Sequence, residues 1–276
     1  MRCALITIAH GRHAHLLRQY EALGASTVQP DDVILVAMDD RSLADLPLGD
    51  VGPTIVDLPA GRRGLPLAAA RNAGAEAALR AGADVLIFLD VDCLPGPELV
   101  ESYLAAAADP AWAGSVLCGP VTYLPPAPEG GYDLAALDEL ADPHPARPAP
   151  EPGTVIRGTN PALFWSLSFA VTAQTWRAIG GFADIYEGYG AEDTDFALTA
   201  KAAGVHLAWV GGARAFHQHH PTANPPVQHL DDIVHNANIY FERWGAWPMG
   251  GWLEQFQRAG LVRWTADSLE RRRLTD

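Results

Sequence analysis

The sequence predicts an α/β protein with a largely parallel sheet covered by helices on both faces. In the first half, apolar runs of strand length alternate with helical segments, which is the pattern of such a sheet. Charged and polar side chains gather where these runs end, namely His10, Arg12, Asp39, Asp40, Asp90 and Asp92. Ligands of parallel sheets bind beyond the carboxyl ends of the strands, so these ends are the first candidate for a site.

Strands are predicted over 3–9, 32–38, 54–56 and 85–89, and helices over 13–23 and 67–81. The first strand is followed by no G-x-G-x-x-G motif, and the chain contains no G-x-x-x-x-G-K-[ST] motif. Because each of these motifs supplies the backbone that holds the phosphates, the dinucleotide-binding and P-loop classes are excluded.

Composition narrows the class further. The chain has 276 residues, 49% of them hydrophobic, and a formal net charge of −14, which argues against a general nucleic-acid binder. No apolar run approaches the length of a membrane span. The three cysteines are scattered and suggest no disulfide framework, so we expect a cytoplasmic setting. The C-terminal tryptophans leave peripheral contact with the inner membrane face open.

The segment Leu89-Asp90-Val91-Asp92-Cys93 follows a fully apolar strand. On an extended chain its two aspartates project to one side, about 6.6–7 Å apart. Carboxylates in that arrangement can hold a hard divalent cation and leave positions open for phosphate oxygens. Aspartates are also common turn formers after strands, so D-x-D alone does not decide between a site and a turn.

In the middle of the chain we expect a helix over 97–108 and strands over 115–124 and 164–171. Between these strands, residues 125–153 are rich in proline and poor in regular signals, which indicates an insertion over the site rather than a domain boundary. Trp165 could stack on a sugar ring, although aromatic residues in strands are more often part of the core.

Residues 176–204 carry the most specific pattern. A glycine-rich approach with Tyr189 and Gly190 leads into Glu192, Asp193 and Asp195 at the start of a predicted helix. Acidic first turns are favoured by the helix dipole, so capping alone would explain one acid but not three. The same dipole is expected to favour the ionised form of Asp193, and Asp195 is expected to be structural.

Histidines follow the next strands, in His217-Gln218-His219-His220. On an extended chain His217 and His219 share a face and His220 takes the other. An imidazole joined to two carboxylates and phosphate oxygens would suit Mn²⁺ or Mg²⁺, with the nitrogen favouring Mn²⁺. Which of the three histidines binds metal stays open.

Three motifs therefore stand in a fixed order: D-x-D after a strand, G-x-G-A-E-D-x-D at a helix start, and histidines after a later strand. With them the chain resembles the inverting, metal-dependent glycosyltransferases of the GT-A fold, glycosyltransferase family 2. Its second half is similar to the galactosyltransferase C-terminal region of the animal β-1,4-galactosyltransferases and polypeptide N-acetylgalactosaminyltransferases. The resemblance covers roughly residues 3–220 and is sharpest in GGFADIYEGYGAEDTDFALTAKAAG.

This resemblance implies roles. Asp92 and His217 would bind the metal, with Asp90 against the ribose or the metal and His219 as a further candidate ligand. Asp193 would be the general base, with Glu192 holding acceptor or sugar. Donor and nucleotide contacts would come from Thr7, Ala9, His10, Arg12, Asp39, Asp40, Arg71, Asn72 and Asp90. Acceptor or sugar contacts would come from Trp165, Tyr189, Gly190 and Glu192.

The resemblance also implies an organisation. Residues 1–220 would form one GT-A catalytic domain: a nucleotide-binding half (1–124), the proline-rich loop (125–155) and an acceptor and catalytic half (156–220). Residues 221–276 would form a helical extension packed on it, beginning with a helix over 228–244. The tryptophans of the extension could line an acceptor groove, a homodimer interface or a packed cap, and an apolar helical face favours the cap.

We therefore expect a metal-dependent inverting glycosyltransferase that uses a nucleotide-diphosphate sugar, with a UDP-sugar as the expected donor and a hydroxyl-bearing glycan, lipid-linked compound or small molecule as acceptor. A sugar-phosphate nucleotidyltransferase is the alternative enzyme, although His10-Gly11-Arg12 is a poor match to its glycine-rich loop. A non-catalytic nucleotide-sugar-binding protein is the alternative outside enzymes.

Overall fold

The computed structural model describes residues 1–49, 52–221 and 223–272. Its centre is an eight-stranded sheet. Across the sheet the strands are β3 (Thr54–Leu58), β2 (Asp32–Met38), β1 (Cys3–Ala9), β4 (Val85–Leu89), β9 (Ser168–Thr172), β6 (Ser115–Cys118), β10 (His206–Val210) and β8 (Val155–Gly158). The first four are parallel, and β9 runs antiparallel between β4 and β6. The predicted α/β class with a mostly parallel mixed sheet is confirmed.

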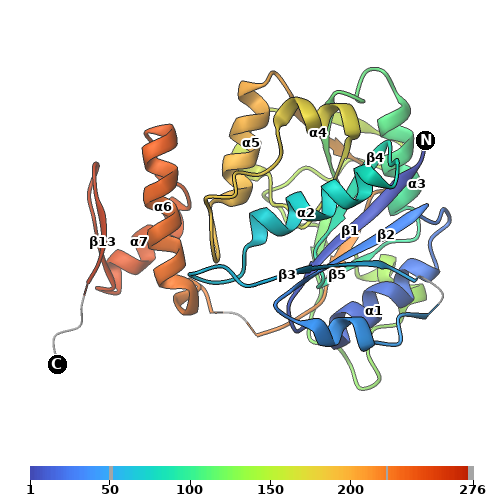
Figure 1. Cartoon of the computed structure of the whole chain (residues 1–276), viewed down its shortest axis with the longest axis horizontal. Coiled ribbons are helices and arrows are strands. Elements are labelled where there is room, and N and C mark those ends of the chain that lie inside the picture. Colours follow the sequence, from blue (N-terminus) through green and yellow to red (C-terminus); the bar gives the residue numbers. More distant parts are fainter. Residues whose placement is uncertain (50–51, 222, 273–276) are drawn as a thin grey trace.

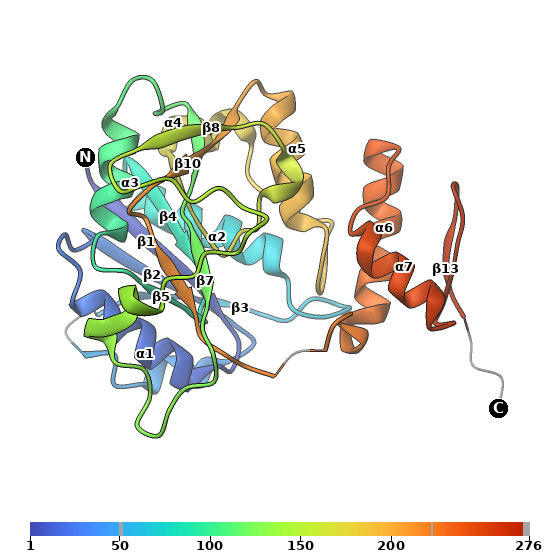
Figure 2. The ribbon, with the colours of Figure 1, turned by 180° about the vertical axis from the view of Figure 1, so that it is seen from behind.

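Helices cover both faces of this sheet. On one face lie α2 (Leu67–Arg80), α4 (Ala173–Ile179) and α5 (Glu192–Ala202), and on the other α1 (His13–Gly24) and α3 (Leu99–Ala108) (Figures 1 and 2). Successive residues of β1 alternate between the two cores, Ala4 and Ile6 on one side and Cys3 and Leu5 on the other. This explains why the strand is apolar throughout rather than alternating with polar residues.

The single strand expected over 115–124 is wrong. The chain forms β6 and then β7 (Val121–Tyr123), which belongs to a separate three-stranded sheet with β5 (Cys93–Pro95) and β11 (Ala215–His217). The break falls at Gly119-Pro120, where proline has no N–H for the ladder. A Cβ at Gly119 would lie 1.9 Å from the carbonyl oxygen of Ala213, so only glycine fits this close approach.

The strand expected over 164–171 begins later, at Ser168. Before it the chain forms a short 3-10 helix, η4 (Pro161–Leu163), because the Asn160 side chain accepts a hydrogen bond from the Ala162 N–H at 3.1 Å. A backbone hydrogen bond from Leu167 N–H to the Trp165 carbonyl then closes a turn. Trp165 is therefore a half-buried turn residue rather than a core residue of a strand.

The proline-rich segment is more ordered than its sequence indicates. It contains a 3-10 helix, η3 (Leu134–Leu140), and buries Tyr132 and Leu137 against Leu94 and Phe216 of the small sheet. This apolar cluster also includes Ala22 of α1. The segment thus shares a core with α1 and the small sheet.

The C-terminal part comprises η5 (Val227–His229), α6 (Leu230–Trp244), α7 (Gly250–Arg258), β12 (Val262–Trp264) and β13 (Leu269–Arg271). It lies beside α5 at one end of the molecule (Figure 1). The extension was expected to be helical, yet it also contains the β12–β13 hairpin, and its first α-helix begins at Leu230. Its own apolar cluster includes Ile233, Leu253 and Phe256. Residues 222 and 273–276 of the expected extension lie outside the described residues.

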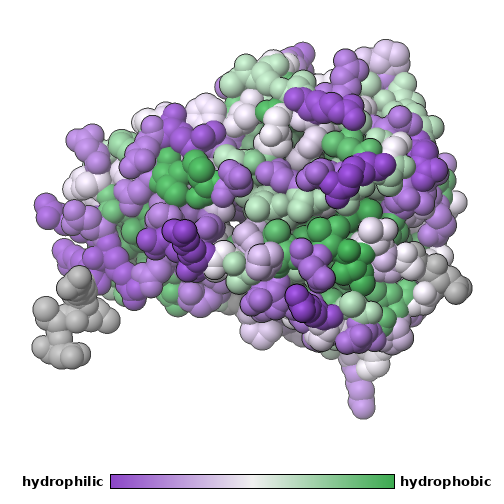
Figure 3. Space-filling view, in the orientation of Figure 1, coloured by the Kyte–Doolittle hydropathy of each residue, from purple (hydrophilic) through white to green (hydrophobic). Residues whose placement is uncertain are grey.

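The surface is mainly hydrophilic on the face shown in Figure 3, with apolar side chains gathered below α2, over the side of the sheet that ends in β3. In the described ranges, no helix combines the length and the apolar character needed to cross a bilayer. A further 3-10 turn, η1 (Arg41–Asp45), follows β2 and belongs to the site described next.

Candidate active site at the carboxyl ends of the strands

The parallel strands β1 and β2 bring their carboxyl ends together as expected. Asp40, after β2, accepts hydrogen bonds from the Gly11 N–H at 2.8 Å and the Ser42 N–H at 3.2 Å, and its Oδ2 lies 3.0 Å from His13 Nε2. A further bond from the Ser42 hydroxyl and these donors lower the pKa of Asp40 to about 2, so it is ionised at neutral pH. This loop is rigid before any ligand arrives.

Backbone strain marks the same region. Outside glycine, the described residues with positive φ are Arg12 (55°), Asp39 (49°), Ala191 (75°) and Met249 (52°). Two of them, Arg12 and Asp39, are predicted site residues after β1 and β2, and a third, Ala191, directly precedes the predicted residue Glu192. Such conformations cost about 1–3 kcal/mol each and persist where the surrounding structure enforces them, often at functional sites.

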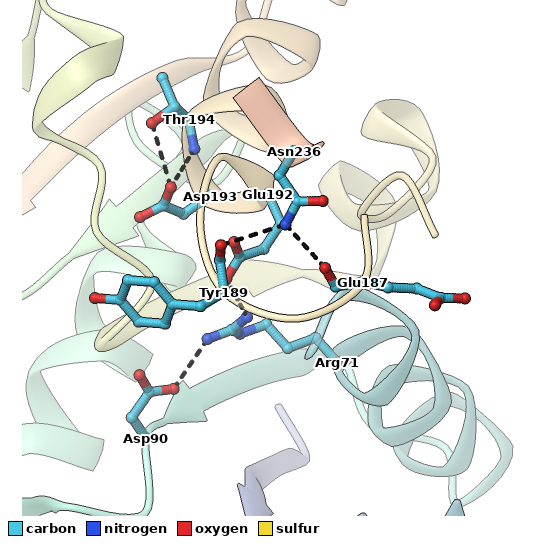
Figure 4. Close-up of polar contacts among 8 residues, drawn as sticks. All are labelled: Arg71, Asp90, Glu187, Tyr189, Glu192, Asp193, Thr194 and Asn236. Carbon is cyan, nitrogen blue, oxygen red and sulfur yellow. Dashed lines mark hydrogen bonds and ion pairs between the residues drawn. The ribbon is translucent and has the colours of Figure 1, made fainter. Parts of the chain in front are cut away.

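Arg71 is the buried centre of the acidic cluster. Its Nη2 lies 3.2 Å from Asp90 and its Nη1 lies 3.4 Å from Glu192, so one guanidinium from α2 joins β4 to the start of α5 (Figure 4). Its guanidinium also lies over the ring of Phe182, 5.3 Å from the centroid. Burial raises the pKa of Asp90 to about 6 despite the favourable charge of Arg71. Burial and the neighbouring Asp193 raise the pKa of Glu192 to about 7.

Asp193 faces away from Arg71 and is held by its neighbour. Its Oδ1 accepts hydrogen bonds from the Thr194 N–H at 2.6 Å and the Thr194 hydroxyl at 3.2 Å (Figure 4). Burial nevertheless raises the pKa of Asp193 above its ordinary value. The helix terminus was expected to favour the ionised form, so this is a correction: desolvation outweighs the donors at the helix start. A more basic carboxylate is a better proton acceptor near neutral pH.

The two aspartates of the D-x-D segment do not share one extended strand. The Cys93 N–H bonds to the Asp90 carbonyl at 2.8 Å, which closes a turn between β4 and β5. Asp90 then faces Arg71, whereas Asp92 faces the histidines. The carboxylates therefore belong to two neighbouring groups rather than one pair.

Asp92 forms a compact group with two histidines. Its Oδ2 lies 3.5 Å from His217 Nε2 and 3.2 Å from His220 Nε2, and one ligand atom from each residue lies within 4.8 Å of the others. The extended-chain expectation paired His217 with His219, but β11 ends at His217 and the Gln218 N–H bonds to the Asp92 carbonyl at 2.7 Å. That turn brings His220 inward and leaves His219 exposed.

The donor set fits a divalent transition metal. One carboxylate oxygen and two imidazole nitrogens are ligands that such an ion takes, and they leave coordination positions for ligand oxygens. Burial lowers the pKa of His217, which favours the neutral imidazole that a metal requires. Although burial opposes it, the two imidazoles lower the pKa of Asp92.

The other residues predicted to contact the nucleotide-sugar donor either pack inside the fold or are exposed to solvent. Thr7 and Ala9 are buried, and the Asn72 side chain bonds to the backbone of Phe182, so it fixes the approach to α5. His10, Arg12 and Asp39 are exposed beside Asp40. The predicted acceptor residue Tyr189 is 37% exposed and stacks on His229 with ring centroids 4.5 Å apart.

Sequence reasoning missed Gln19, a fully buried residue of α1. Its Nε2 donates to the carbonyls of Asp90 and Cys93 at 2.7 and 2.8 Å, and its Oε1 accepts from the Thr7 hydroxyl at 2.9 Å. It therefore shapes the turn that separates Asp90 from Asp92. A glutamine among the apolar positions of helix 13–24 is the only sequence signal for it.

Sequence reasoning also missed the hydrogen bonds that tie α5 to the extension. The buried Asp195 accepts on one oxygen from Tyr186 at 3.0 Å, from Arg243 Nε at 2.7 Å and from Trp244 Nε1 at 2.7 Å. Two of these donors come from α6. Asp195 was expected to have a structural role, and its hydrogen bonds tie α5 to the extension.

The loop before α5 is held by the same helix. Asn236 of α6 donates to the carbonyls of Glu187 at 3.0 Å and Tyr189 at 3.3 Å. Asp232 accepts from the Tyr189 N–H at 3.2 Å, and a Cβ at Gly188 would lie 2.4 Å from its carboxyl group. The side chains of α6 thus define the path of the loop that carries Tyr189.

Comparison with known proteins agrees with this geometry. A family model described as "N-terminal domain of galactosyltransferase" matches residues 161–221. Validoxylamine A glucosyltransferase of Streptomyces hygroscopicus subsp. limoneus is 30% identical over 231 residues, covering 74% of this chain and 49% of the relative. The enzyme of the same name from subsp. jinggangensis is 34% identical over 161 residues, 52% of this chain and 37% of that relative. The chain thus spans half or less of the length of these relatives.

Solved structures share the fold. GalNAc-T7 with UDP, GalNAc and Mn²⁺ superposes with a TM-score of 0.56 at 15% identity, over 79% of this chain and 44% of that one. S. aureus TarS (residues 1–349) gives a TM-score of 0.54 at 11% identity, over 87% and 64%. The chain has the GT-A fold and is similar to glycosyltransferases of that fold. Within that class it is similar to the galactosyltransferase region and to the validoxylamine A glucosyltransferases.

Proposed function

We propose that this protein transfers a sugar from a UDP-sugar to an acceptor hydroxyl with inversion at the sugar carbon. The observation that carries the proposal is the position of Asp90 between two different groups. Asp90 follows β4 two residues before Asp92 of the histidine group, and Arg71 joins it to Glu192 at the start of α5. Burial raises its pKa, and so do the charges of Asp92 and Asp193. A candidate metal site and a candidate base therefore face one region from opposite halves of the chain.

Asp92, His217 and His220 would hold the metal, Mn²⁺ by their donor set. When bound, the ion would neutralise the negative charge that develops on the leaving diphosphate. Around this site, Gln19 fixes the turn that aims Asp92 toward the histidines. Asp40 and the strained loop after β1 would hold the nucleoside, because they lie at the ends of β1 and β2 where such ligands bind.

Asp193 would take the proton from the attacking hydroxyl. Its raised pKa suits a base, and the Thr194 donors fix the orientation of its carboxyl group. Glu192, held by Arg71, would bind hydroxyls of the sugar or the acceptor. Attack on the face opposite the leaving group inverts the anomeric carbon, and it needs only this one carboxylate on the acceptor side.

The similar proteins suggest which compounds to test first. GalNAc-T7 was solved with UDP and Mn²⁺, and TarS was solved with UDP-GlcNAc. Two relatives are glucosyltransferases named for validoxylamine A. UDP-glucose and UDP-GlcNAc are therefore the first donors, and validoxylamine A is the first acceptor.

The test of this function is Asp193→Asn. The change removes the basic carboxylate and keeps its shape, so transfer should fall about 10²–10⁴-fold. UDP affinity in the presence of Mn²⁺ should stay within about twofold of the unmodified protein, because Asp193 lies apart from the metal group. The measurements are product formation by mass spectrometry and UDP binding by calorimetry.

Asp184→Asn is the matched control, since Asp184 is an exposed aspartate of the same loop. It should leave transfer unchanged. Full activity of Asp193→Asn would remove Asp193 from the role of base, and no turnover of any UDP-sugar by the unmodified protein would refute the proposed function itself.

A further inference from the structure

A row of aromatic rings leads from the metal group to the proline-rich segment. Tyr123 lies 4.8 Å from His217 between ring centroids, His144 lies 5.9 Å from Tyr123, and Trp165 lies 4.9 Å from His144. We call Tyr123, His144 and Trp165 the aromatic row. Tyr123 is 46% exposed, and both other rings are partly exposed. A tyrosine with this exposure next to a buried catalytic region has no packing explanation.

The proline-rich segment is fixed against β7 so that His144 joins this row. Pro143 forms an antiparallel bridge with Thr122, and the Asp142 N–H donates to the Thr122 hydroxyl at 3.1 Å. The His144 N–H donates to the Val121 carbonyl at 3.2 Å. The prolines and these bonds hold the aromatic row in place before a ligand binds, which lowers the entropy cost of binding.

Arg147 supports the row from inside. It is only 5% exposed, and its guanidinium lies 5.2 Å from the ring centroid of Trp165 and 4.9 Å from that of Trp209. Its Nη2 donates to the Gly119 carbonyl at 3.5 Å, while its Nε and Nη1 have no hydrogen-bond partner among the described residues. A buried cation held between two tryptophans fixes the plane of Trp165.

The position of the row is next to the proposed reaction rather than at the nucleoside end. Tyr123 pairs with His217 in the register of β7 and β11, and the two ring centroids lie 4.8 Å apart. It therefore lies beside a candidate metal ligand. The nucleoside is expected at Asp40, beyond β1 and β2 of the eight-stranded sheet, whereas Tyr123 belongs to the separate three-stranded sheet.

We propose that the aromatic row is the acceptor subsite and takes a polyhydroxylated six-membered carbon ring, a sugar or a cyclitol. Such a ring has an apolar C–H face that covers an aromatic ring and a hydroxyl edge that His144 and the Tyr123 hydroxyl can bind. Binding sites of this kind combine aromatic walls with a few placed polar groups. This inference rests on the proposed function and assigns the proline-rich segment to acceptor recognition.

The kinetic test compares Tyr123→Ala and Trp165→Ala with Leu140→Ala, an exposed apolar residue of the same segment (43% exposed). Loss of a stacked ring should raise the KM for validoxylamine A about 10-fold or more, with little change for Leu140→Ala. Hydrolysis of UDP-glucose without acceptor and affinity for UDP with Mn²⁺ should not change. Tyr123→Phe keeps the ring and loses only the hydroxyl, so its KM should lie between those of the unmodified protein and Tyr123→Ala.

A binding measurement distinguishes failure of the acceptor subsite from failure of the proposed function. Saturation-transfer NMR with myo-inositol and maltose should show contact in the unmodified protein and in Asp193→Asn, and a weaker signal in Tyr123→Ala. This result would support the subsite even if no transfer were found. Absence of any signal from both probes in the unmodified protein would overturn it. So would an unchanged acceptor KM in both alanine variants, or a joint loss of UDP affinity and hydrolysis, which would assign the rings to the donor.

Discussion

Glu192 and Asp193 are adjacent in sequence but differ in partner. Glu192 is paired with Arg71, and Asp193 is bonded to Thr194. Burial raises the pKa of both carboxylates above the ordinary values of such groups. A change of charge at one of these two residues should therefore shift the pH dependence of the reaction.

Glu192→Gln should shift the acidic limb of the transfer rate to lower pH by about one unit. The change removes a negative charge beside Asp193 and leaves Arg71 with one carboxylate fewer to neutralise, and both effects stabilise the ionised base. Because the base must be ionised, a lower pKa extends activity toward acid. The measurement is kcat/KM from pH 4.5 to 8.5, compared as a profile so that a lower overall rate does not matter.

Glu139→Gln, at an exposed position of the proline-rich segment, is the control and should leave the limb in place. A limb that stays fixed in Glu192→Gln, or moves to higher pH, would contradict the electrostatic account of the pair.

Single residues were predictable where their chemistry is distinctive. Asp92, His217 and Asp193 could be selected because carboxylates and imidazoles follow strand ends or a helix start. His220 was not preferred over His219, because the alternation rule holds only on extended chain and β11 ends at His217. Gln19 gave no comparable signal, since its partners are backbone carbonyls brought close only by folding.

Among the elements, the loop before α5 depends on glycine at one position. Gly188 has a φ of +73°, and a Cβ there would lie 2.4 Å from the Asp232 carboxyl carbon. Gly204, at the other end of α5, has a similar φ of +76° but has no atom within 4 Å of the same Cβ position. Replacing each glycine by alanine therefore separates two costs. Backbone strain would arise at both positions, whereas displacement of Asp232 would arise only at Gly188.

Gly204→Ala should cost about 1–2 kcal/mol of unfolding free energy, the cost of left-handed backbone for a residue with a Cβ. Gly188→Ala should cost more, and it should also lower transfer, because Asp232 must move and it holds the Tyr189 N–H. Urea unfolding and transfer rate measure the two effects. Equal losses of both quantities in the two variants would contradict the role of Asp232.

Elements were predictable where apolar runs have the length and period of one structure, as in β1, β2, β4 and α5. The run 115–124 looked like one strand because its composition stays apolar through the point where it changes sheet. Pro120 is the local signal for the break, and the contact of Gly119 with Ala213, distant in sequence, appears only in the folded chain.

For the whole molecule, Mn²⁺ and UDP should stabilise the fold together. A ligand at 100 times its Kd contributes about 2.7 kcal/mol, which raises the Tm by roughly 5–10 °C for a chain of this size. Asp92→Ala or His220→Ala should abolish the part of this rise that requires Mn²⁺. His219→Ala should keep it, because His219 is exposed and outside the group. A rise that disappears in His219→Ala but persists in His220→Ala would reverse the assignment of the ligands.

The fold class was predictable from the sequence, but the order of the strands in the sheet was not. Alternating strands and helices indicate a parallel sheet, but they do not reveal that β9 inserts between β4 and β6, or that β8 pairs with β10 at the edge. Those pairings join segments far apart in the chain, and local patterns carry no information on them.

The hydrogen bonds from α6 to Asp195 and to the loop before α5 have a consequence for folding during synthesis. A ribosome produces every proposed chemical group, from Asp92 to His220, before it produces residues 230–244. Until that helix emerges, Asp195 has only Tyr186 of its three donors, and the carbonyls of Glu187 and Tyr189 lack Asn236. A nascent chain can thus hold its complete set of reactive side chains while the loop that carries Tyr189 still awaits its last supports.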